Sequence, residues 1–146
     1  MALIRMVRVA AIVPGLIWLG LSAQAQGPQT FKGRLSVVPI DVTMRTDYTG
    51  TGTASATLSG MKLSVSGSFE GLHTAATAAR LGQGSVTGVT GATIADLTVS
   101  KATSGTISGS VDLTPEQVEN LRKGKFYVQV YSERAPTGNL RAWLLR

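Results

Sequence analysis

The chain of 146 residues contains no cysteine and a single histidine, His73. Without cysteine, the protein has no disulfide framework, thiolate zinc site, cysteine nucleophile or lipidated N-terminal cysteine. A single histidine excludes any metal site or catalytic group that needs two imidazoles. We interpret His73 as an ordinary surface or loop histidine, because no partner that would give it a function is recognisable beside it.

The sequence also lacks the short motifs of common enzymes. It has no glycine-x-serine-x-glycine elbow and no Walker sequence. The pair Gly82-x-Gly84 is followed by Thr87 where a dinucleotide-binding turn needs glycine. We therefore predict a protein that is not an enzyme, with no catalytic residues, no cofactor and no metal. The alternative is a hydrolase or a metal or redox enzyme on the same fold, which the shortage of histidine and cysteine disfavours.

Charge is sparse and mostly positive. Charged residues make up 15% of the chain and apolar residues 43%, with a formal net charge of +6. This composition is typical of a globular domain. The positive excess either keeps the protein soluble, which we favour, or serves to bind an anionic envelope polymer or membrane surface. The basic residues are scattered and form no stripe interleaved with aromatics, so we expect no nucleic-acid partner. An envelope glycan, an anionic ligand or a protein partner is expected instead.

The N-terminus has the pattern of an export signal. Arg5 and Arg8 precede an apolar run at 9–21, and Ala23-Gln24-Ala25 supplies the small-x-small cleavage box. At about 1.5 Å per residue the run spans roughly 20 Å, short of the roughly 30 Å hydrocarbon core of a bilayer. We predict a signal peptide at 1–25, a mature domain at 26–146 in the periplasm or outside the cell, and no stable membrane insertion after cleavage. The alternative is an uncleaved N-terminal anchor.

Most of the remaining chain has the alternation of β-strands. In residues 61–69, one face is shared by Met61, Leu63, Val65, Gly67 and Phe69, while Lys62 and the serines share the other. Such regular alternation predicts a sheet with one buried and one wet face. Strands are predicted at 31–39, 53–58, 61–69, 94–99, 106–113, 126–131 and 140–145, and a short strand near 75–81.

One helix is predicted in the C-terminal half. Thr114 is a strong N-cap residue, and Gln117 three positions later completes a capping box. Val118 and Leu121 lie one turn apart and are expected to pack on the core, and Gly124 ends the helix. With eight short strands and one helix, the sequence favours an all-β immunoglobulin-like or superoxide-dismutase-like Greek-key β-sandwich. A turn through Pro136-Thr-Gly138 is expected to join the last two strands.

Several segments occur in the order and spacing of a known family. They are Phe69-Glu-Gly-Leu72, the helix between Leu113 and Leu121, Gly124-Lys-Phe-Tyr127, and Pro136-x-Gly138-x-Leu140-Arg141. Over about residues 31–144 the chain resembles the CHRD domain, the module named from chordin and found alone in many exported bacterial proteins. The resemblance implies an exported, non-enzymatic binding or structural module.

The chain departs from that family at three positions. The family typically has an alanine-histidine-isoleucine-histidine stretch where this chain reads Ala79-Arg80-Leu81-Gly82. It commonly has a further histidine at the position of Tyr131. Since copper or zinc in such a fold needs imidazole donors, no metal role is carried over to this chain.

The residues at those positions suggest a tentative ligand site. Tyr127, Gln129 and Tyr131 are predicted to share one strand face, and the resemblance places Arg80 beside them. An arginine between two tyrosines can bind a carboxylate, a phosphate or a sugar face. The alternative is that these four side chains only complete the packing of a sheet face. A third possibility is an adhesion or scaffolding domain whose open sheet edge pairs with a partner strand.

The signal-peptide hypothesis predicts a mature chain that begins at Gln26, because cleavage follows the small residue at Ala25. N-terminal sequencing of the exported protein measures this directly. An intact Met1 recovered in the membrane fraction would instead support the uncleaved anchor.

Overall fold

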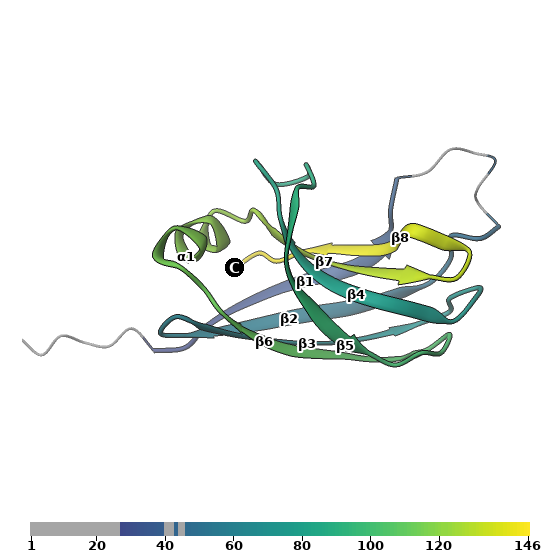
Figure 1. The fold of residues 1–146 in the computed structure, drawn as a ribbon, viewed down its shortest axis with the longest axis horizontal. Coiled ribbons are helices and arrows are strands. Elements are labelled where there is room, and N and C mark those ends of the chain that lie inside the picture. Colours follow the sequence, from purple (N-terminus) through teal and green to yellow (C-terminus); the bar gives the residue numbers. More distant parts are fainter. Residues whose placement is uncertain (1–26, 40–42, 44–45) are drawn as a thin grey trace, which may run out of the picture.

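The computed structural model describes residues 27–39, 43 and 46–146. In this part of the chain, strands run from end to end of an elongated molecule and one helix lies at one end (Figure 1). The elements are β1 (Gln29–Val37), β2 (Thr51–Ser59), β3 (Lys62–Glu70), β4 (Ala76–Gln83), β5 (Ala92–Val99), β6 (Gly105–Asp112), α1 (Pro115–Arg122), β7 (Phe126–Ser132) and β8 (Ala135–Trp143).

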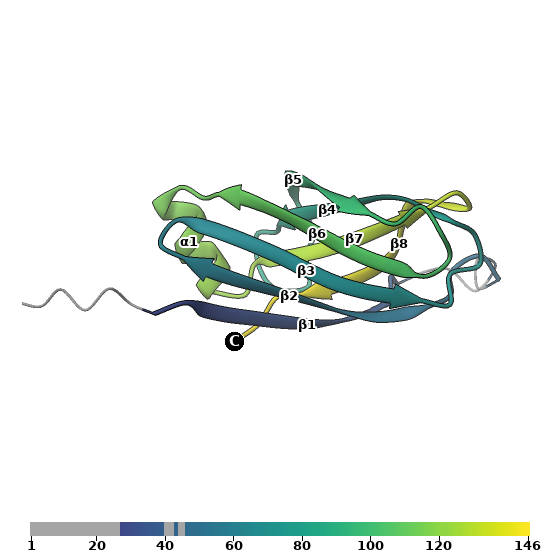
Figure 2. The ribbon, with the colours of Figure 1, turned by 90° about the horizontal axis from the view of Figure 1, so that it is seen from below.

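The strands close into one antiparallel barrel in the order β1-β2-β3-β6-β5-β4-β7-β8. Two of the eight seams are short, because β1 meets β8, and β5 meets β6, through two residue pairs each. The barrel is therefore flattened into two faces (Figures 1 and 2). We call β1-β2-β3-β6 sheet one and β5-β4-β7-β8 sheet two.

The predicted all-β class with one short helix in the C-terminal half is confirmed. The predicted immunoglobulin-like or superoxide-dismutase-like sandwich is not confirmed, since the described strands close into a barrel. Alternation along a strand shows which side chains are buried, whereas closure depends on how strand edges pair. The connections are of the Greek-key kind: β4, β5 and β6 form a meander bordered by β3 on one side and β7 on the other.

The core fills the space between the two sheets. Alternate residues of each strand point inward, as predicted for most of 61–69, where Leu63, Val65 and Phe69 are buried. Met61, predicted on the same face, is 41% exposed, because it lies in the turn before β3. The largest fully buried side chains come from both sheets, and they include Phe31 and Leu35 of β1 as well as residues of β4, β7 and β8. Each sheet therefore has a dry inner face and an outer face that is free to carry function.

The turn predicted at Pro136-Thr-Gly138 is wrong, because these residues lie inside β8. The chain turns earlier, at residues 133–134. Ser132 then faces Ala135 while Val130 faces Leu140, so β8 holds extra residues between these pairs and bulges there. A bulge suits proline, which cannot donate to a ladder. It also suits Gly138, whose φ of 127° is in the region that favours glycine.

Helix α1 begins with the predicted capping box. The Gln117 backbone N–H donates to Thr114 Oγ1 at 3.2 Å, and the Thr114 N–H donates to Gln117 Oε1 at 2.9 Å. Val118 and Leu121 are buried, as predicted. These two bonds satisfy N–H groups that the first turn of a helix leaves without partners.

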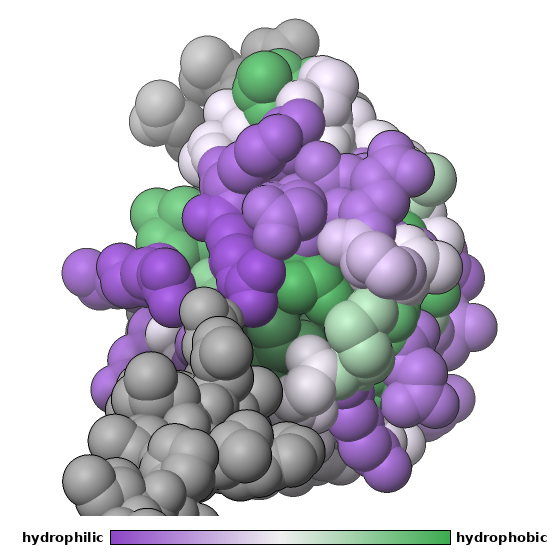
Figure 3. Space-filling view, turned by 90° about the vertical axis from the view of Figure 1, so that its left-hand side faces the viewer, coloured by the Kyte–Doolittle hydropathy of each residue, from purple (hydrophilic) through white to green (hydrophobic). Residues whose placement is uncertain are grey.

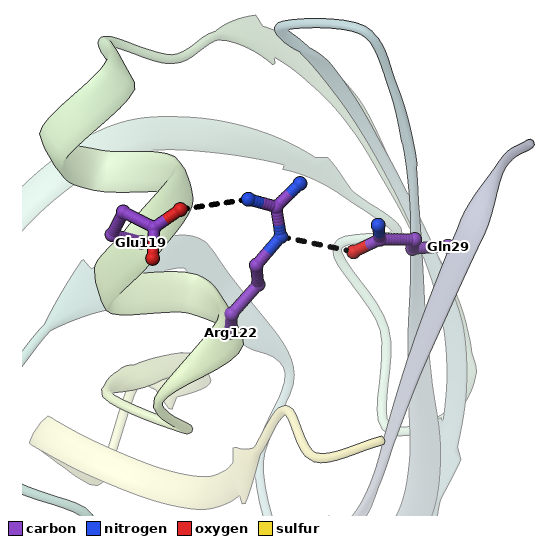
Figure 4. A network of polar contacts seen from close by, with 3 residues as sticks. All are labelled: Gln29, Glu119 and Arg122. Carbon is purple, nitrogen blue, oxygen red and sulfur yellow. Dashed lines mark hydrogen bonds and ion pairs between the residues drawn. The ribbon is translucent and has the colours of Figure 1, made fainter. Parts of the chain in front are cut away.

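Arg122 joins the end of α1 to the first strand (Figure 4). Its Nε donates to Gln29 Oε1 at 3.2 Å, and an Nη donates to Glu119 Oε1 at 2.7 Å. At this end of the barrel, hydrophilic residues dominate the surface and a hydrophobic area is visible among them (Figure 3). The helix is thus fixed on one side by its apolar residues and on the other by a polar bridge to β1.

The signal peptide predicted at 1–25 lies outside the described residues, and so does most of the loop before Thr46. Among the residues that are described, no helix combines the length and the apolar character needed to cross a membrane.

Replacement of Thr114 by alanine should lower the free energy of unfolding by about 1 kcal/mol, because it removes the cap of α1. Adding Gln117→Ala should then cost less than Gln117→Ala alone, since the box is already broken. Urea denaturation of the four proteins of this cycle measures both effects. Fully additive losses would show that the two side chains act independently.

Candidate functional site

Strand β7 separates the tentative site residues from the core. Phe126, Val128 and Val130 are completely buried and point inward. The alternation along the strand therefore turns Tyr127, Gln129 and Tyr131 to the outer face of sheet two, as predicted.

A row of polar residues crosses this outer face. Arg80 of β4 is paired in register with Asp96 of β5 on one side and with Gln129 of β7 on the other. Gln129 is in turn paired with Arg141 of β8. We call Asp96, Arg80, Gln129 and Arg141 the polar ladder. Directly opposed residues of opposite charge or matching hydrogen-bonding character stabilise a sheet face.

Gln129 is the buried centre of the ladder, with 5% of its surface exposed. Its Oε1 accepts a hydrogen bond from Arg141 Nε at 2.8 Å, and its Nε2 donates to the Thr137 carbonyl oxygen at 3.1 Å. A Cβ on Gly138 would lie 2.2 Å from Nε2. The bulge in β8 therefore provides both an acceptor for this amide and, through a glycine, the space that the amide fills.

Tyr127 is also buried, with 6% exposed. Its ring lies over Gly82, where a Cβ would come within 2.3 Å of Cζ, and it packs on Trp143 with ring centroids 4.9 Å apart. Its hydroxyl donates to the Gly91 carbonyl oxygen at 3.1 Å and accepts from the Gly91 N–H at 3.2 Å. Tyr127 thus anchors the loop after β4 to the sheet, and its polar end is satisfied.

Arg80 and Tyr131 form the accessible part of the site. The guanidinium carbon of Arg80 lies 5.0 Å from the centre of the Tyr131 ring, and Tyr131 is half-buried. Arg80 Nε donates to Asp96 Oδ1 at 3.2 Å, with 46% of the Arg80 side chain and 83% of the Asp96 side chain exposed. An ion pair this exposed contributes at most about 1 kcal/mol, so it can open without disturbing the fold.

The structure brings Arg80 to only one of the two tyrosines, so the expected arrangement of an arginine between both is wrong. Arg141 approaches Tyr127 instead, with its guanidinium carbon 5.8 Å from the ring centre. Tyr127 and Gln129 are occupied by intramolecular contacts and lie beside Tyr131 in the same outward row of β7. Whether any of the four predicted residues contacts a ligand stays a prediction.

Three residues of this face were not assigned to the site from the sequence: Asp96, Arg141 and Trp143. In β8, Leu140 and Ala142 are buried and alternate with Arg141 and Trp143. That alternation is visible in the sequence and places both residues on the outer face. Which residue of β7 lies opposite Arg141 depends on the β8 bulge, which the sequence alone does not reveal.

The chemistry of this face is recognition by charge, stacking and hydrogen bonds. The predicted surface or loop position of His73 is confirmed, since it is exposed in the loop before β4. Within the described residues, no group of three or more histidine, cysteine, aspartate or glutamate side chains is placed to hold a metal ion. A stacked and exposed guanidinium can accept a carboxylate, a phosphate or a sugar ring.

Comparison with known proteins confirms the resemblance found in the sequence. The family model described as the CHRD domain matches residues 31–144, which includes the whole polar ladder and all eight strands except the first two residues of β1. No curated protein and no solved structure matches the chain.

Replacement of Gln129 by alanine should lower the free energy of unfolding by about 1–3 kcal/mol, because it leaves the Thr137 carbonyl and Arg141 without their partner. Gly138→Ala should cost less in the Gln129→Ala background than in the parent, since the atom that its Cβ meets is gone. Thermal and urea denaturation of the four proteins measure this coupling. An equal cost in both backgrounds would show that the amide does not require the glycine.

Proposed function

Because the chain belongs to the CHRD domain family, we propose that it acts as a non-enzymatic binding module, exported to the periplasm or secreted. Its ligand site is the exposed Arg80–Tyr131 pair on the outer face of sheet two. The ligand is a small acidic or sugar compound. Tyr127 and Gln129 belong to the site as positioning residues that lie beside this pair on the same face of β7.

The observation that carries the proposal is the stacking of Arg80 on Tyr131 at 5.0 Å, with the guanidinium still partly open to solvent. A guanidinium held on a ring face keeps its remaining N–H groups in a fixed plane. A bidentate acceptor such as a carboxylate meets those groups with little reorganisation, which lowers the entropic cost of binding.

Asp96 supports this proposal because its carboxylate pairs with the Arg80 guanidinium in the absence of a ligand. It accepts one hydrogen bond from Arg80 Nε, and 83% of its side chain is exposed. A ligand carboxylate would replace a weak exposed ion pair with a similar one and would leave the stacking of the Arg80 guanidinium on the Tyr131 ring in place. A shallow pocket beside Arg80 and Asp96, also lined by Thr77, Thr98 and Lys101, gives such a ligand space and a second cation.

The second candidate function is structural. In that case Arg80 only covers the sheet, and the Arg80–Asp96–Tyr131 group is one more surface contact. The burial of Tyr127 and Gln129 favours this reading for those two residues. The response of Arg80 to a ligand distinguishes the two functions, because an arginine that only covers the sheet is not expected to bind one.

Arg80→Ala and Tyr131→Ala should each weaken binding of galacturonate or inorganic phosphate by about tenfold, while changing the free energy of unfolding by no more than about 1 kcal/mol. The measurement is NMR titration of the Arg80 Nε–H signal in the parent, with chemical-shift mapping in the variants. Arg134→Ala is the matched control, because Arg134 also forms an exposed ion pair, with Asp47 at 3.2 Å, but lies off the polar ladder.

Loss of folding in Arg80→Ala or Tyr131→Ala would support the structural function. An Arg80 signal that does not move with either compound would contradict the proposed site.

A further inference from the structure

The outer face of sheet one differs in kind from that of sheet two. Its outward positions are serine or threonine throughout β2, and in β3 and β6 they are so except near the strand ends. The register aligns these hydroxyls across the strands, as in the row Ser55, Ser66 and Ser108. The face therefore carries a grid of hydroxyls with spacings of about 4.8 Å between strands and about 6.7 Å along them.

Most of these hydroxyls are free to bind something outside the protein. Among the described residues, one pair of hydroxyls of this grid is hydrogen-bonded to each other: Ser55 Oγ and Ser66 Oγ lie 3.2 Å apart. A hydroxyl both donates and accepts, so the face offers many weak hydrogen bonds without charge. This is the chemistry with which sugar hydroxyls are recognised.

Strand β1 adds two cations to one side of this grid. Lys32 is in register with Ser55, and Arg34 with Thr53. Both are exposed, and they point to the same side of the strand because they are two residues apart. Neither forms an ion pair with any described residue. Two neighbouring cations without partners favour an anionic ligand.

The cations and hydroxyls meet in a trough that is open to solvent. Its lining includes the start of β2 and the end of β3, and these strand ends lie at the end of the sheet away from α1 (Figure 2). Its lining includes Lys32, Arg34, Ser55 and Ser68, with Glu70 at the end of β3. Its volume is about 1020 Å³, which is at the upper end of the range of about 300–1,000 Å³ for small-ligand pockets. The trough thus has room for more than one sugar ring, and the hydroxyl grid continues beyond it onto β6.

From these observations we propose that the outer face of sheet one binds an acidic polysaccharide, with its acid groups on Lys32 and Arg34 and its hydroxyls on the grid. Phe69 is the one aromatic residue of the trough lining, and its side chain is buried. Stacking on exposed rings is a main contribution to the binding of single-stranded nucleic acids, so this lining disfavours a nucleic acid. The feature that favours a polysaccharide is the grid of uncharged hydroxyls beside the two cations. This surface is separate from the Arg80–Tyr131 pair and does not rest on the function proposed for it.

The probe is sodium polygalacturonate, which is titrated by calorimetry into the protein purified from the cells that express it, with whatever N-terminus those cells leave. Lys32→Gln combined with Arg34→Gln should weaken binding by about tenfold, since each exposed charge pair accounts for up to about fivefold. Glu70→Gln should strengthen binding, because it removes a like charge from the trough. Raising the salt concentration should weaken binding in the parent more than in the double variant.

The controls separate this surface from other basic residues. Lys62→Gln is the matched variant, because Lys62 is an exposed cation of the same sheet that lies outside the trough, and it should bind as the parent does. The titrations are repeated in the Arg80→Ala background, where galacturonate units of the polymer no longer bind at the Arg80–Tyr131 pair, and the loss caused by Lys32→Gln with Arg34→Gln should be the same there. The methyl-esterified polymer, which has the same sugar hydroxyls without charge, should bind at least about tenfold more weakly than the acid form.

Three results would overturn the proposal. One is unchanged affinity in the Lys32 and Arg34 double variant. The second is an equal loss in Lys62→Gln, which would indicate a nonspecific charge effect. The third is binding of a twenty-nucleotide oligothymidylate as tight as that of polygalacturonate, which would indicate a general polyanion surface. If the double variant fails to fold, the direction of the change in Glu70→Gln decides.

Discussion

The buried amide of Gln129 is the constraint on which the outer face of sheet two depends. A primary amide at 5% exposure must find partners for its donor and acceptor inside the protein, because an unpaired buried polar group costs about 1–3 kcal/mol. The acceptor is the Thr137 carbonyl, which is presented by the bulge of β8, and the donor is Arg141. One side chain therefore fixes the bulge, the register of β7 with β8 and the orientation of an arginine.

This requirement gives a physical meaning to the segment Pro136-x-Gly138-x-Leu140-Arg141. Proline and glycine suit a bulge, where a ladder hydrogen bond is absent and φ is positive. Leu140 returns to the core, and Arg141 returns to the outer face, where it meets Gln129. The stretch Pro136-Thr-Gly138, which looks like a turn in the sequence, is thus the part of β8 that accommodates the amide.

The sequence predicts the strands, the capped helix and the split of β7 into core and outer residues, because these follow from periods of two and 3.6 residues and from local capping chemistry. It does not predict barrel closure, the β8 bulge or the pairing of Arg141 with Tyr127. Each of these depends on which strands are neighbours and in which register, and β4 meets β7 from a distance of more than forty residues along the chain. The four tentative site residues were placed on the correct face, but burial divides them into two that support and two that are accessible.

The two outer faces of the barrel divide the chemistry of recognition between them. On sheet two, each ladder residue already has a partner in the protein, so a ligand there must compete with Asp96 for Arg80. On sheet one, Lys32, Arg34 and most hydroxyls have no such partner among the described residues, so a ligand there competes only with water.

A site whose groups already have partners in the protein binds through a few well-directed bonds and discriminates between small ligands by geometry. A face of many unsatisfied weak groups gains affinity only by repetition, which favours a polymer over a small molecule. The physical difference between the faces therefore lies in how far the protein satisfies its own polar groups. On the outer face of sheet two the buried Gln129 amide organises its neighbours, whereas the serines and threonines described on sheet one have no buried centre of that kind.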